Sequence, residues 1–384
     1  MPRLSIVVTY RNRNVERVKR FFASIDAQSY RDFELIFVDY GSDANFASAV
    51  GEIADKYTWC RHLYNDTRGM LWNKSHAINS GVRQSTGEYF LSTDIDLIYT
   101  RDVLKHAMEH AHPSKQLFSL AYMLPETFTQ FETLETERPV DFVESPYQSI
   151  GMFHLLSNQV FQEKLGGLDE FYCIWGREDT DGYVRGRNAG LESYWMDNRK
   201  FPLYHQWHET HTASSSQFTL GWWEDVVMHF ELRRDDIKRN QPNWGAVLLT
   251  SERKTINDPP YTTMILPKDM NPFVRSRVMA DIIQFLKQCP GKVLLIKIGK
   301  ERNILDLKGR KLVHKIGFKA IRSLNRALEL ANINLEMRTT NRGPLTSEGS
   351  FLYFLFNLIV KHSLVKEYYY SDDEDGCHSY KLCS

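Results

Sequence analysis

Residues 87–99 read GEYFLSTDIDLIY, an apolar run whose carboxyl end carries two aspartates, Asp94 and Asp96. The aromatic and aliphatic residues predict a buried strand, although strand interiors are depleted in Asp and carboxylates are rarely buried without a partner. The two-residue period of a strand would point both carboxylates to one face. Two hard oxygen donors there suit Mn²⁺ or Mg²⁺. The competing interpretation is that one Asp caps the following segment and the other is solvated.

Strands and helices alternate on the amino-terminal side of this run. Residues 4–10 and 33–41 are apolar runs typical of buried strands, and residues 14–29 between them place apolar side chains at helical spacing. This repetition predicts a doubly wound α/β sheet of the Rossmann type, in which a ligand lies beyond the carboxyl ends of the strands. The remaining elements expected in this part are a helix at 44–57, a strand at 60–66 and a helix at 73–86.

The character of the chain changes near residue 258. We predict two domains, a catalytic domain at 1–258 and a smaller α/β accessory domain of unknown role at 259–384. A basic amphipathic helix is expected at 314–332, and its cations form either a solvated face or a contact with an anionic polymer, a membrane surface or a partner protein. The other expected elements are helices at 273–288 and 349–363 and strands at 292–299 and 333–339.

The composition excludes some classes of protein. Lys plus Arg and Asp plus Glu both number 48, so no basic excess favours a nucleic-acid partner. The five cysteines are scattered without a CxxC pair, which favours a reducing compartment. The chain shows no signal-peptide layout, and no apolar run reaches the roughly 18 to 20 residues of a membrane span. We therefore expect a cytoplasmic protein, with a peripheral position at the inner face of the membrane as the alternative.

Polar residues follow the first two predicted strands. The stretch TYRNR at 9–13 places Arg11 and Arg13 where a phosphate would lie, and arginine offers fork-shaped donors for such a group. No GxGxxG follows this strand and no GxxxxGK[ST] occurs, so the dehydrogenase and P-loop hypotheses lose their main support. Asp39 ends the second strand, where it would bind a base or ribose or simply form a turn.

Two later stretches combine acids, aromatics and imidazoles. In WGREDTDGYVRG at 175–186, acids open a helix whose amino terminus favours negative charge, so capping is one explanation. A Trp beside acids also suits a sugar, because the ring packs on C–H groups, carboxylates accept from hydroxyls, and one acid can act as general base. In YHQWHETH at 204–211, His205, His208 and His211 offer imidazoles to a metal, without the HExxH arrangement. A polar loop stacked on Trp207 is the alternative.

Taken in order, TYRNR, VDYGSD, WNK, DID, GGLDEFY, WGREDTD and YHQWH resemble the motifs of a GT-A-fold glycosyltransferase of the inverting family-two kind. The second half resembles the carboxyl-terminal domain shared by β-1,4-galactosyltransferases and chondroitin-polymerising enzymes. The resemblance spans about residues 3 to 245. It implies a Rossmann-like mixed sheet flanked by helices, which is the fold of nucleotide-diphospho-sugar transferases.

The resemblance also implies roles for particular residues. Asp179 would be the catalytic base, and Asp96 with His205 would bind Mn²⁺ or Mg²⁺, with His208 as the alternate ligand. Arg11 and Arg13 would contact the donor diphosphate, Asp39 would read uracil, and Asp94 would lie near the ribose or donor sugar. The rest of the donor-nucleotide set would be Thr9, Tyr10, Asn73 and Lys74, and the sugar and acceptor set would be Trp175, Gly176, Glu178 and Asp181.

These roles predict a metal-dependent enzyme that moves a sugar from a UDP-sugar to a hydroxyl of a glycan or glycoconjugate, with inversion. The inserted Arg177 and the Thr180 change the acid cluster relative to the galactosyltransferases, so the donor sugar does not follow. The alternatives are a retaining GT-A transferase and a carbohydrate-binding protein that does not catalyse. A metal-dependent phosphatase or nuclease is disfavoured, because the acids follow the fourth strand and not the first.

Overall fold

A computed structural model of the 384-residue chain shows two compact units. The first comprises Met1–Ala213 and Trp223–Glu252, and the second comprises Ser214–Trp222 and Arg253–Ser384. The prediction that these parts are a catalytic and an accessory domain stays a prediction. The structure describes residues 3–135, 150–209, 220–247, 252–257, 259–266, 272–298, 303–306, 323, 326–327, 330, 335–338, 355–361, 364–372 and 378–384.

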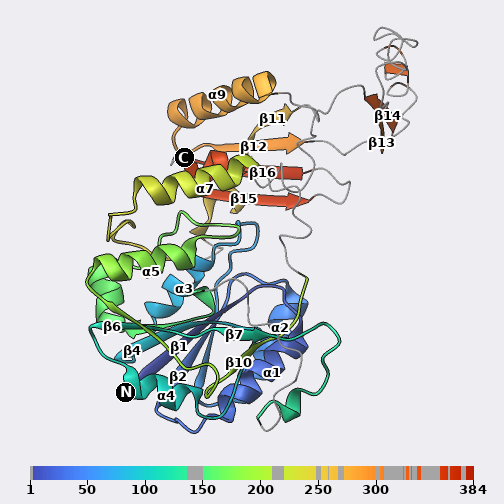
Figure 1. The fold of residues 1–384 in the computed structure, drawn as a ribbon. Coiled ribbons are helices and arrows are strands. Elements are labelled where there is room, and N and C mark those ends of the chain that lie inside the picture. The colour runs from blue at the N-terminus through green and yellow to red at the C-terminus, as the bar shows by residue number, and fades with distance from the viewer. Residues whose placement is uncertain are drawn as a thin grey trace. The chain divides into compact units, whose positions relative to one another are not determined.

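The first unit is built on a seven-stranded mixed sheet in the order β3-β2-β1-β4-β8-β6-β9 (Figure 1). Strand β1 pairs in parallel with β2 and β4, β2 pairs in parallel with β3, and β8 runs antiparallel between β4 and β6. The strands are β1 (Leu4–Tyr10), β2 (Phe33–Asp39), β3 (Cys60–Tyr64), β4 (Tyr89–Asp94), β6 (Lys115–Phe118), β8 (Phe153–Ser157) and β9 (Glu192–Trp195).

Alternate residues of each strand enter separate apolar cores on the two faces of this sheet. Ile6 and Val8 of β1 pack with the cluster that includes Phe22 of α1, whereas Val7 packs with the cluster that includes Ile78 of α3. Burial of one such side chain contributes about 1.5–3 kcal/mol. The helices are α1 (Val15–Asp26), α2 (Ala44–Ala54), α3 (Lys74–Val82), α4 (Val103–His110), α5 (Glu178–Asn188) and α7 (Leu220–Leu232), with shorter turns η1 (Phe131–Thr133), η2 (Ile150–Met152) and η3 (Val160–Leu165).

A second, three-stranded sheet positions the site residues. It has the order β5-β10-β7, with β5 (Leu97–Tyr99), β10 (Leu203–His205) and β7 (Ala121–Met123). Strands β5 and β10 are antiparallel, and Leu97 is the register partner of His205. The Gln206 N–H donates to the Asp96 carbonyl over 2.9 Å. This register brings the end of β10 to the turn that precedes β5.

The second unit has its own sheet, in the order β11-β12-β16-β15, and a two-stranded sheet of β13 and β14. Its central strand β12 pairs in parallel with β11 and antiparallel with β16, and Ile296 and Ile298 of β12 are fully buried. The elements are α8 (Lys254–Asn257), β11 (Thr262–Leu266), α9 (Pro272–Gln288), β12 (Val293–Ile298), β13 (Asn303–Asp306), β14 (Leu335–Arg338), η5 (Asn357–Lys361), β15 (Glu367–Asp372) and β16 (His378–Cys383).

The predicted fold class, a Rossmann-like mixed sheet flanked by helices with a separate carboxyl-terminal α/β region, is confirmed. One local expectation is wrong. Strand β4 ends at Asp94, and Ile95–Asp96 form a turn, so the two aspartates do not share one strand face. The expected basic helix at 314–332 lies almost entirely outside the described residues.

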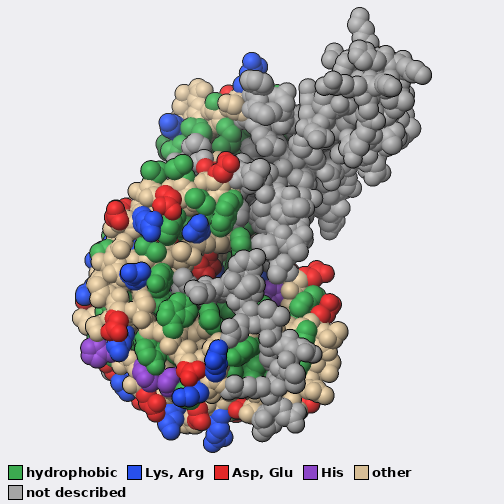
Figure 2. Space-filling view, in the orientation of Figure 1, with side chains coloured by type: hydrophobic (Ala, Val, Ile, Leu, Met, Phe, Trp, Pro, Cys, Tyr) green, Lys and Arg blue, Asp and Glu red, His purple; other side chains and the backbone are tan. Residues whose placement is uncertain are grey.

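Two surface properties accompany this fold. On the face drawn in Figure 2, acidic and basic side chains of the described residues are interspersed, in keeping with the equal numbers of the two kinds in the sequence. Within the described part of the chain, no helix is both long and apolar enough to cross a bilayer.

Candidate active site

Asp96, His205 and His208 form a cluster at the edge where β5 and β10 pair. The His205 Nε2 lies 3.4 Å from Asp96 Oδ1, and the His208 Nε2 lies 3.1 Å from Asp96 Oδ2. One potential ligand atom from each residue lies within 4.8 Å of the others. The sequence places His205 and His208 about 110 residues after Asp96, and the three-stranded sheet unites them. This cluster contains both predicted metal ligands and the predicted alternate.

The chemistry of this cluster fits a divalent cation. Burial alone would raise the pKa of Asp96, but the imidazoles of His205 and His208 hold that pKa well below its usual range. Asp96 Oδ1 and His205 Nδ1 are buried without a hydrogen-bond partner among the described residues. A carboxylate that stays ionised in a largely enclosed place, with a bare oxygen and two imidazoles around it, suits an ion such as Mn²⁺.

Lys74 connects the end of β4 to the start of α5. Its ammonium lies 2.7 Å from Asp94 Oδ1 and 4.0 Å from Glu178 Oε1. Burial alone would lower the pKa of Lys74, but the charges of Asp94 and Glu178 hold it above its usual range. Lys74 also lowers the pKa of Asp96 through its charge. The two aspartates of the DID motif therefore form ion pairs with different partners: Asp94 with Lys74, and Asp96 with His205 and His208.

Glu178 and Asp179 begin α5 beside this lysine. Burial first, and then the charge of Asp179, raise the pKa of Glu178 to about 7. Asp179 Oδ1 accepts hydrogen bonds from the N–H and hydroxyl of Thr180, at 2.6 and 3.3 Å. A Cβ at Gly151 would lie 2.5 Å from Asp179 Oδ2, so only a glycine fits beside that oxygen. Lys74, Glu178, Asp179 and Gly151 line one small cavity together with His154.

The loop before α5 has an unusual backbone. Ile174, Gly176 and Arg177 have φ angles of 72°, 96° and 71°, a region that a β-branched residue such as Ile rarely adopts. Trp175, 49% exposed, stacks on Trp223 of α7 with ring centroids 6.0 Å apart. The Arg177 guanidinium lies over the Trp223 ring, 5.6 Å from its centroid. Residues held in sparsely populated conformations concentrate at functional sites, which supports the prediction for this stretch.

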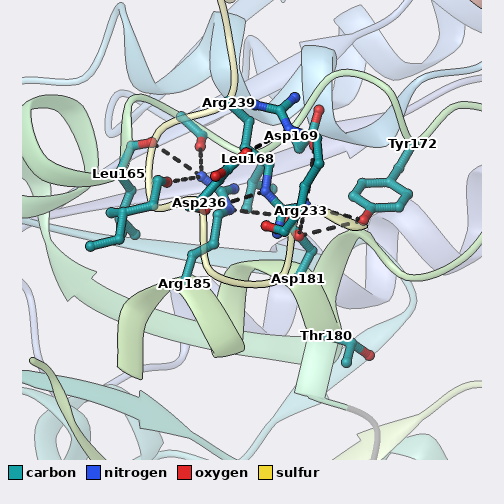
Figure 3. Close-up of polar contacts among 12 residues, drawn as sticks. Leu165, Leu168, Asp169, Tyr172, Thr180, Asp181, Arg185, Arg233, Asp236 and Arg239 are labelled. Atoms are coloured by element: carbon teal, nitrogen blue, oxygen red, sulfur yellow. Dashed lines mark hydrogen bonds and ion pairs between the residues drawn. The ribbon is translucent and has the colours of Figure 1, made fainter. Parts of the chain in front are cut away.

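Asp181 lies on the buried face of α5, in a network of buried charges (Figure 3). Its side chain is fully buried, with Oδ2 2.7 Å from Arg185 Nε and Oδ1 2.5 Å from Arg239 Nη1. Asp169 lies 3.4 Å from the same Arg239 nitrogen and 2.8 Å from His229 Nε2. The Arg185 guanidinium also donates to the carbonyl oxygens of Leu165, Gly167 and Ile237. This placement favours a structural role for Asp181 over the sugar contact that we predicted.

Five of the predicted donor-nucleotide residues lie at or just after the carboxyl ends of β1 and β2: Thr9, Tyr10, Arg11, Arg13 and Asp39. The Arg11 guanidinium donates to Met70 O at 2.9 Å and to Thr67 O at 3.3 Å, so it fixes the loop after β3. Asp39 is buried, its Oδ1 accepts the Ser42 N–H, and its Oδ2 lacks a hydrogen-bond partner among the described residues. Burial raises the pKa of Asp39. A bare buried acceptor suits a donor group on a base or ribose.

The other members of that set have structural contacts. Tyr10 is buried and donates its hydroxyl to Arg13 O, and Thr9 is 8% exposed beside it. Asn73 caps α3 by accepting the His76 N–H, and its amide donates to Glu170 O. Asn73 therefore ties the start of α3 to the segment before the Trp175 loop.

Several residues that shape the site escaped the sequence reasoning. Trp223 lies in a part of the chain that we did not interpret, and Arg239, Asp169 and His229 are single charged residues without a motif. Gly151 follows a segment interrupted by prolines. The sequence signal for Asp169 was the acid of the GGLDEFY stretch.

A comparison with protein families identifies the amino-terminal part of the chain. The model described as glycosyl transferase family 2 matches residues 5–162. Residues 5–162 form a family 2 glycosyltransferase domain. This domain has the GT-A fold and contains Asp39, Lys74, Asp94 and Asp96, whereas Asp179, His205 and His208 lie beyond the matched residues.

Solved structures of several transferases are similar to the chain. A mannosyltransferase from Pyrobaculum calidifontis in complex with GDP-Man and Mn²⁺ is 20% identical, with a TM-score of 0.44, over 63% of this chain and 67% of that one. The catalytic domain of Drosophila β1,4-galactosyltransferase 7 with xylobiose is 17% identical, with a TM-score of 0.37, over 54% and 72%. GalNAc-T7 with UDP, GalNAc and Mn²⁺ is 14% identical, with a TM-score of 0.43, over 54% of this chain and 44% of that one. No curated protein sequence matches significantly. The family 2 assignment therefore rests on the family model.

Proposed function

We propose that this protein is a metal-dependent glycosyltransferase that moves a sugar from a UDP-sugar to a hydroxyl of a glycan or glycoconjugate, with inversion at the anomeric carbon. The observation that carries the proposal is the clustering of Asp96, His205 and His208 just beyond the carboxyl end of β4, a strand of the family 2 glycosyltransferase domain. In open α/β sheets, ligands bind beyond the carboxyl ends of the strands. Synthesis of a polysaccharide or glycoconjugate is the process that fits this reaction.

The cation of this proposal is Mn²⁺ or Mg²⁺. Asp96 and His205 would hold it, and His208 would supply a further imidazole, since its Nε2 lies within ion-pair distance of the same carboxylate. When bound, such an ion neutralises the diphosphate and stabilises the charge that develops as UDP leaves. With an ion at Asp96 and His205 to stabilise the leaving group, the chain would need no second carboxylic acid of the kind that glycosidases use.

The donor nucleotide occupies the ends of β1 and β2. Asp39 offers its bare Oδ2 to the base, and Arg11 and Arg13 supply positive charge near the diphosphate. Lys74 and Asp94 lie between the nucleotide and α5, so they contact the ribose or donor sugar. The ion pairs of Lys74 hold the Lys74 and Asp94 side chains in place before the donor binds. Less conformational entropy is therefore lost when the donor binds.

Asp179 is the general base of this proposal. Its Oδ1 is occupied by Thr180, so Oδ2 takes the proton of the acceptor hydroxyl. The acceptor oxygen then forms a bond to the anomeric carbon, the bond from that carbon to the UDP oxygen breaks, and its electron pair leaves with UDP. Attack from the face opposite UDP inverts the configuration. Trp175 offers its exposed ring to a sugar of the acceptor or donor, and Glu178 accepts from its hydroxyls.

A thermal-shift and calorimetric screen of UDP-sugars with and without Mn²⁺ tests the proposal. A UDP-sugar that binds only the folded chain raises Tm by mass action, and we expect this rise to require Mn²⁺. The Asp96→Ala variant should remain folded, and Mn²⁺ should not enhance the rise in its Tm on addition of a UDP-sugar. The proposal fails if no UDP-sugar raises Tm under any condition. It also fails if the rise in wild type is the same with and without Mn²⁺ and the rise in Asp96→Ala equals it.

The stereochemistry has a separate test. The anomeric configuration of the product, read by NMR, is opposite to that of the donor if the enzyme inverts. Retention would replace this mechanism with that of a retaining GT-A transferase. Binding of sugars without any transfer would leave a carbohydrate-binding protein, the remaining alternative.

A further inference from the structure

Helix α4 carries a second cluster of metal-binding side chains, made of His106, Glu109 and His110. Positions three and four residues apart lie on one face of a helix, so the three side chains project together. One potential ligand atom from each lies within 4.8 Å of the others. Figure 2 shows histidine side chains at the surface in the region where Figure 1 draws α4. The cluster shares no residue with Asp96, His205 and His208.

Aromatic neighbours fix both imidazole rings of this cluster. The His106 ring stacks on Phe201, with centroids 3.9 Å apart and an interplanar angle of 10°. The His110 ring stacks on Tyr194, with centroids 4.5 Å apart and an angle of 17°. The two imidazoles are adjacent, with centroids 4.4 Å apart and an interplanar angle of 59°. Because packing already orders these rings, a ligand that binds them loses little side-chain entropy.

The hydrogen bonding of His110 leaves a lone pair for a metal. Its Nδ1 lies 3.0 Å from the carbonyl oxygen of His106, and a carbonyl can only accept, so Nδ1 carries the proton. In the neutral ring, Nε2 is then the atom with the free lone pair. A histidine that binds a metal usually donates its other ring N–H to a carbonyl or carboxylate in this way.

His106 supplies the second imidazole of the cluster. Its Nδ1 lies 3.9 Å from Glu109 Oε2, and its Nε2 is buried without a hydrogen-bond partner among the described residues. Ligand atoms of a tetrahedral site with bonds of about 2.1 Å stand about 3.4 Å apart. The Glu109 side chain is 56% exposed, so it can close that gap by rotation.

We propose that α4 binds a transition-metal ion of the Zn²⁺ class through His106, Glu109 and His110. Two imidazole nitrogens and one carboxylate oxygen suit Zn²⁺, Co²⁺ or Cu²⁺, whereas Mg²⁺ prefers an all-oxygen site. Three protein ligands leave a position for water or an external group, as in zinc sites that are not purely structural. The inference does not depend on the proposed transfer reaction, because the two clusters have no residue in common.

Isothermal titration of the full chain with Zn²⁺ tests this proposal. The background variant is Asp96→Ala/His205→Ala, which removes two ligands of the other cluster and leaves α4 intact. We expect one Zn²⁺ site in this background. Adding His110→Ala should weaken Zn²⁺ binding at least tenfold, and adding Glu109→Gln should weaken it severalfold. The matched control is His112→Ala, since His112 is an exposed histidine whose Nδ1 contacts Ser114 and which lies outside the cluster.

Two results would overturn the proposal. One is equal Zn²⁺ affinity in the background with and without His110→Ala, and the other is an equal loss in His112→Ala. Far-UV circular dichroism establishes that each variant is folded. If His110→Ala does not fold, the test rests on Glu109→Gln alone, because the new Gln side chain is exposed and leaves the packing of both imidazole rings unchanged. An unchanged Zn²⁺ affinity in Glu109→Gln would then reject the site.

Discussion

Two adjacent acids at the start of α5 meet different surroundings. Glu178 faces Lys74, and its pKa is raised to about 7 by burial and by the charge of Asp179. Asp179 binds the first turn of its own helix through Oδ1 and keeps Oδ2 beside Gly151. Neighbouring carboxylates with such different environments can have different chemical roles. The sequence showed the pair, but only the packing separates the two acids.

Asp179→Asn should abolish sugar transfer and leave nucleotide binding nearly unchanged. The amide cannot take the proton of the acceptor, and loss of a general base lowers kcat by roughly 10²–10⁴-fold. Turnover is measured by UDP release and UDP binding by calorimetry. Near-normal turnover in Asp179→Asn, combined with a large loss in Glu178→Gln, would assign the base to Glu178.

Gly151→Ala should lower kcat without unfolding the protein. The added methyl would lie 2.5 Å from Asp179 Oδ2 and must displace the carboxylate, and a shift of about 1 Å can cost about 10²-fold in rate. The matched control is Gly51→Ala in α2, where the new Cβ would meet only the His62 ring at 3.6 Å. We expect full activity in the control. Equal rates in the two variants would argue against a fixed Asp179 carboxylate.

Glu178→Gln should change the pH dependence of stability. Because the folded-state pKa of about 7 exceeds the ordinary value of 4.5, wild-type stability from this group is fully present below pH 4.5 and is lost as pH rises through 7. Gln does not ionise, so the variant should gain up to about 3 kcal/mol relative to wild type between pH 4.5 and pH 8. Urea unfolding of both proteins at the two pH values measures this. A pH-independent difference would show that Glu178 titrates normally.

At the scale of one element, α5 is fixed by charges buried along its inner face. Asp181 and Arg185 are neighbours on successive turns, and both are fully buried. Arg239 lies between Asp181 and Asp169, and the Arg185 guanidinium donates to three carbonyls of flanking segments. The network therefore fixes the position of α5 along its axis and its rotation about that axis, and α5 carries Asp179.

Arg185→Met should destabilise the first unit by roughly 3–5 kcal/mol, because it leaves a buried carboxylate with one partner fewer and three carbonyls without their donor. The control is Arg187→Met on the same helix, which replaces an exposed arginine and should change stability by less than about 0.5 kcal/mol. Urea unfolding at pH 7 measures both. Similar effects of the two substitutions would mean that the buried network contributes little.

The start of the fold was readable from sequence because β1 and β2 are runs of seven mostly apolar residues and α1 between them has a clear apolar face with Phe21, Phe22 and Ile25. The three-stranded sheet was not predictable, since β5, β7 and β10 have three residues each and carry almost no pattern. The turn at Ile95–Asp96 was missed for the same reason. His205 was predicted as a metal ligand because it is an imidazole after a probable strand. Its proximity to Asp96 results from the pairing of β5 with β10, which the sequence did not predict.

At the scale of the whole molecule, the chain has two cores. The first unit is centred on the seven-stranded sheet, and the second on β12 and its neighbours. In the sequence, it was the change of pattern near residue 258 that suggested two parts. The units themselves divide at Ala213–Ser214, Trp222–Trp223 and Glu252–Arg253, and the catalytic and accessory roles of the two parts stay predictions.

Two cores predict two calorimetric transitions. Arg185→Met should lower the midpoint of one transition only. Ile296→Ala, which empties a fully buried position of β12 and costs about 2–5 kcal/mol, should lower the other. A single transition moved by both substitutions would show that the units unfold as one.

The anchoring of α5 through its buried face has an evolutionary consequence. The buried network holds the helix through Asp181 and Arg185, whereas the loop at 174–177 directly precedes its first turn and leaves Trp175 half exposed. Sequence drift in that loop can reshape the proposed sugar-binding surface while Asp179, the proposed catalytic base, keeps its place. Libraries diversified at Trp175 and Arg177 should therefore alter substrate preference at little expense to folding, which makes this loop the natural starting point for engineering new linkages.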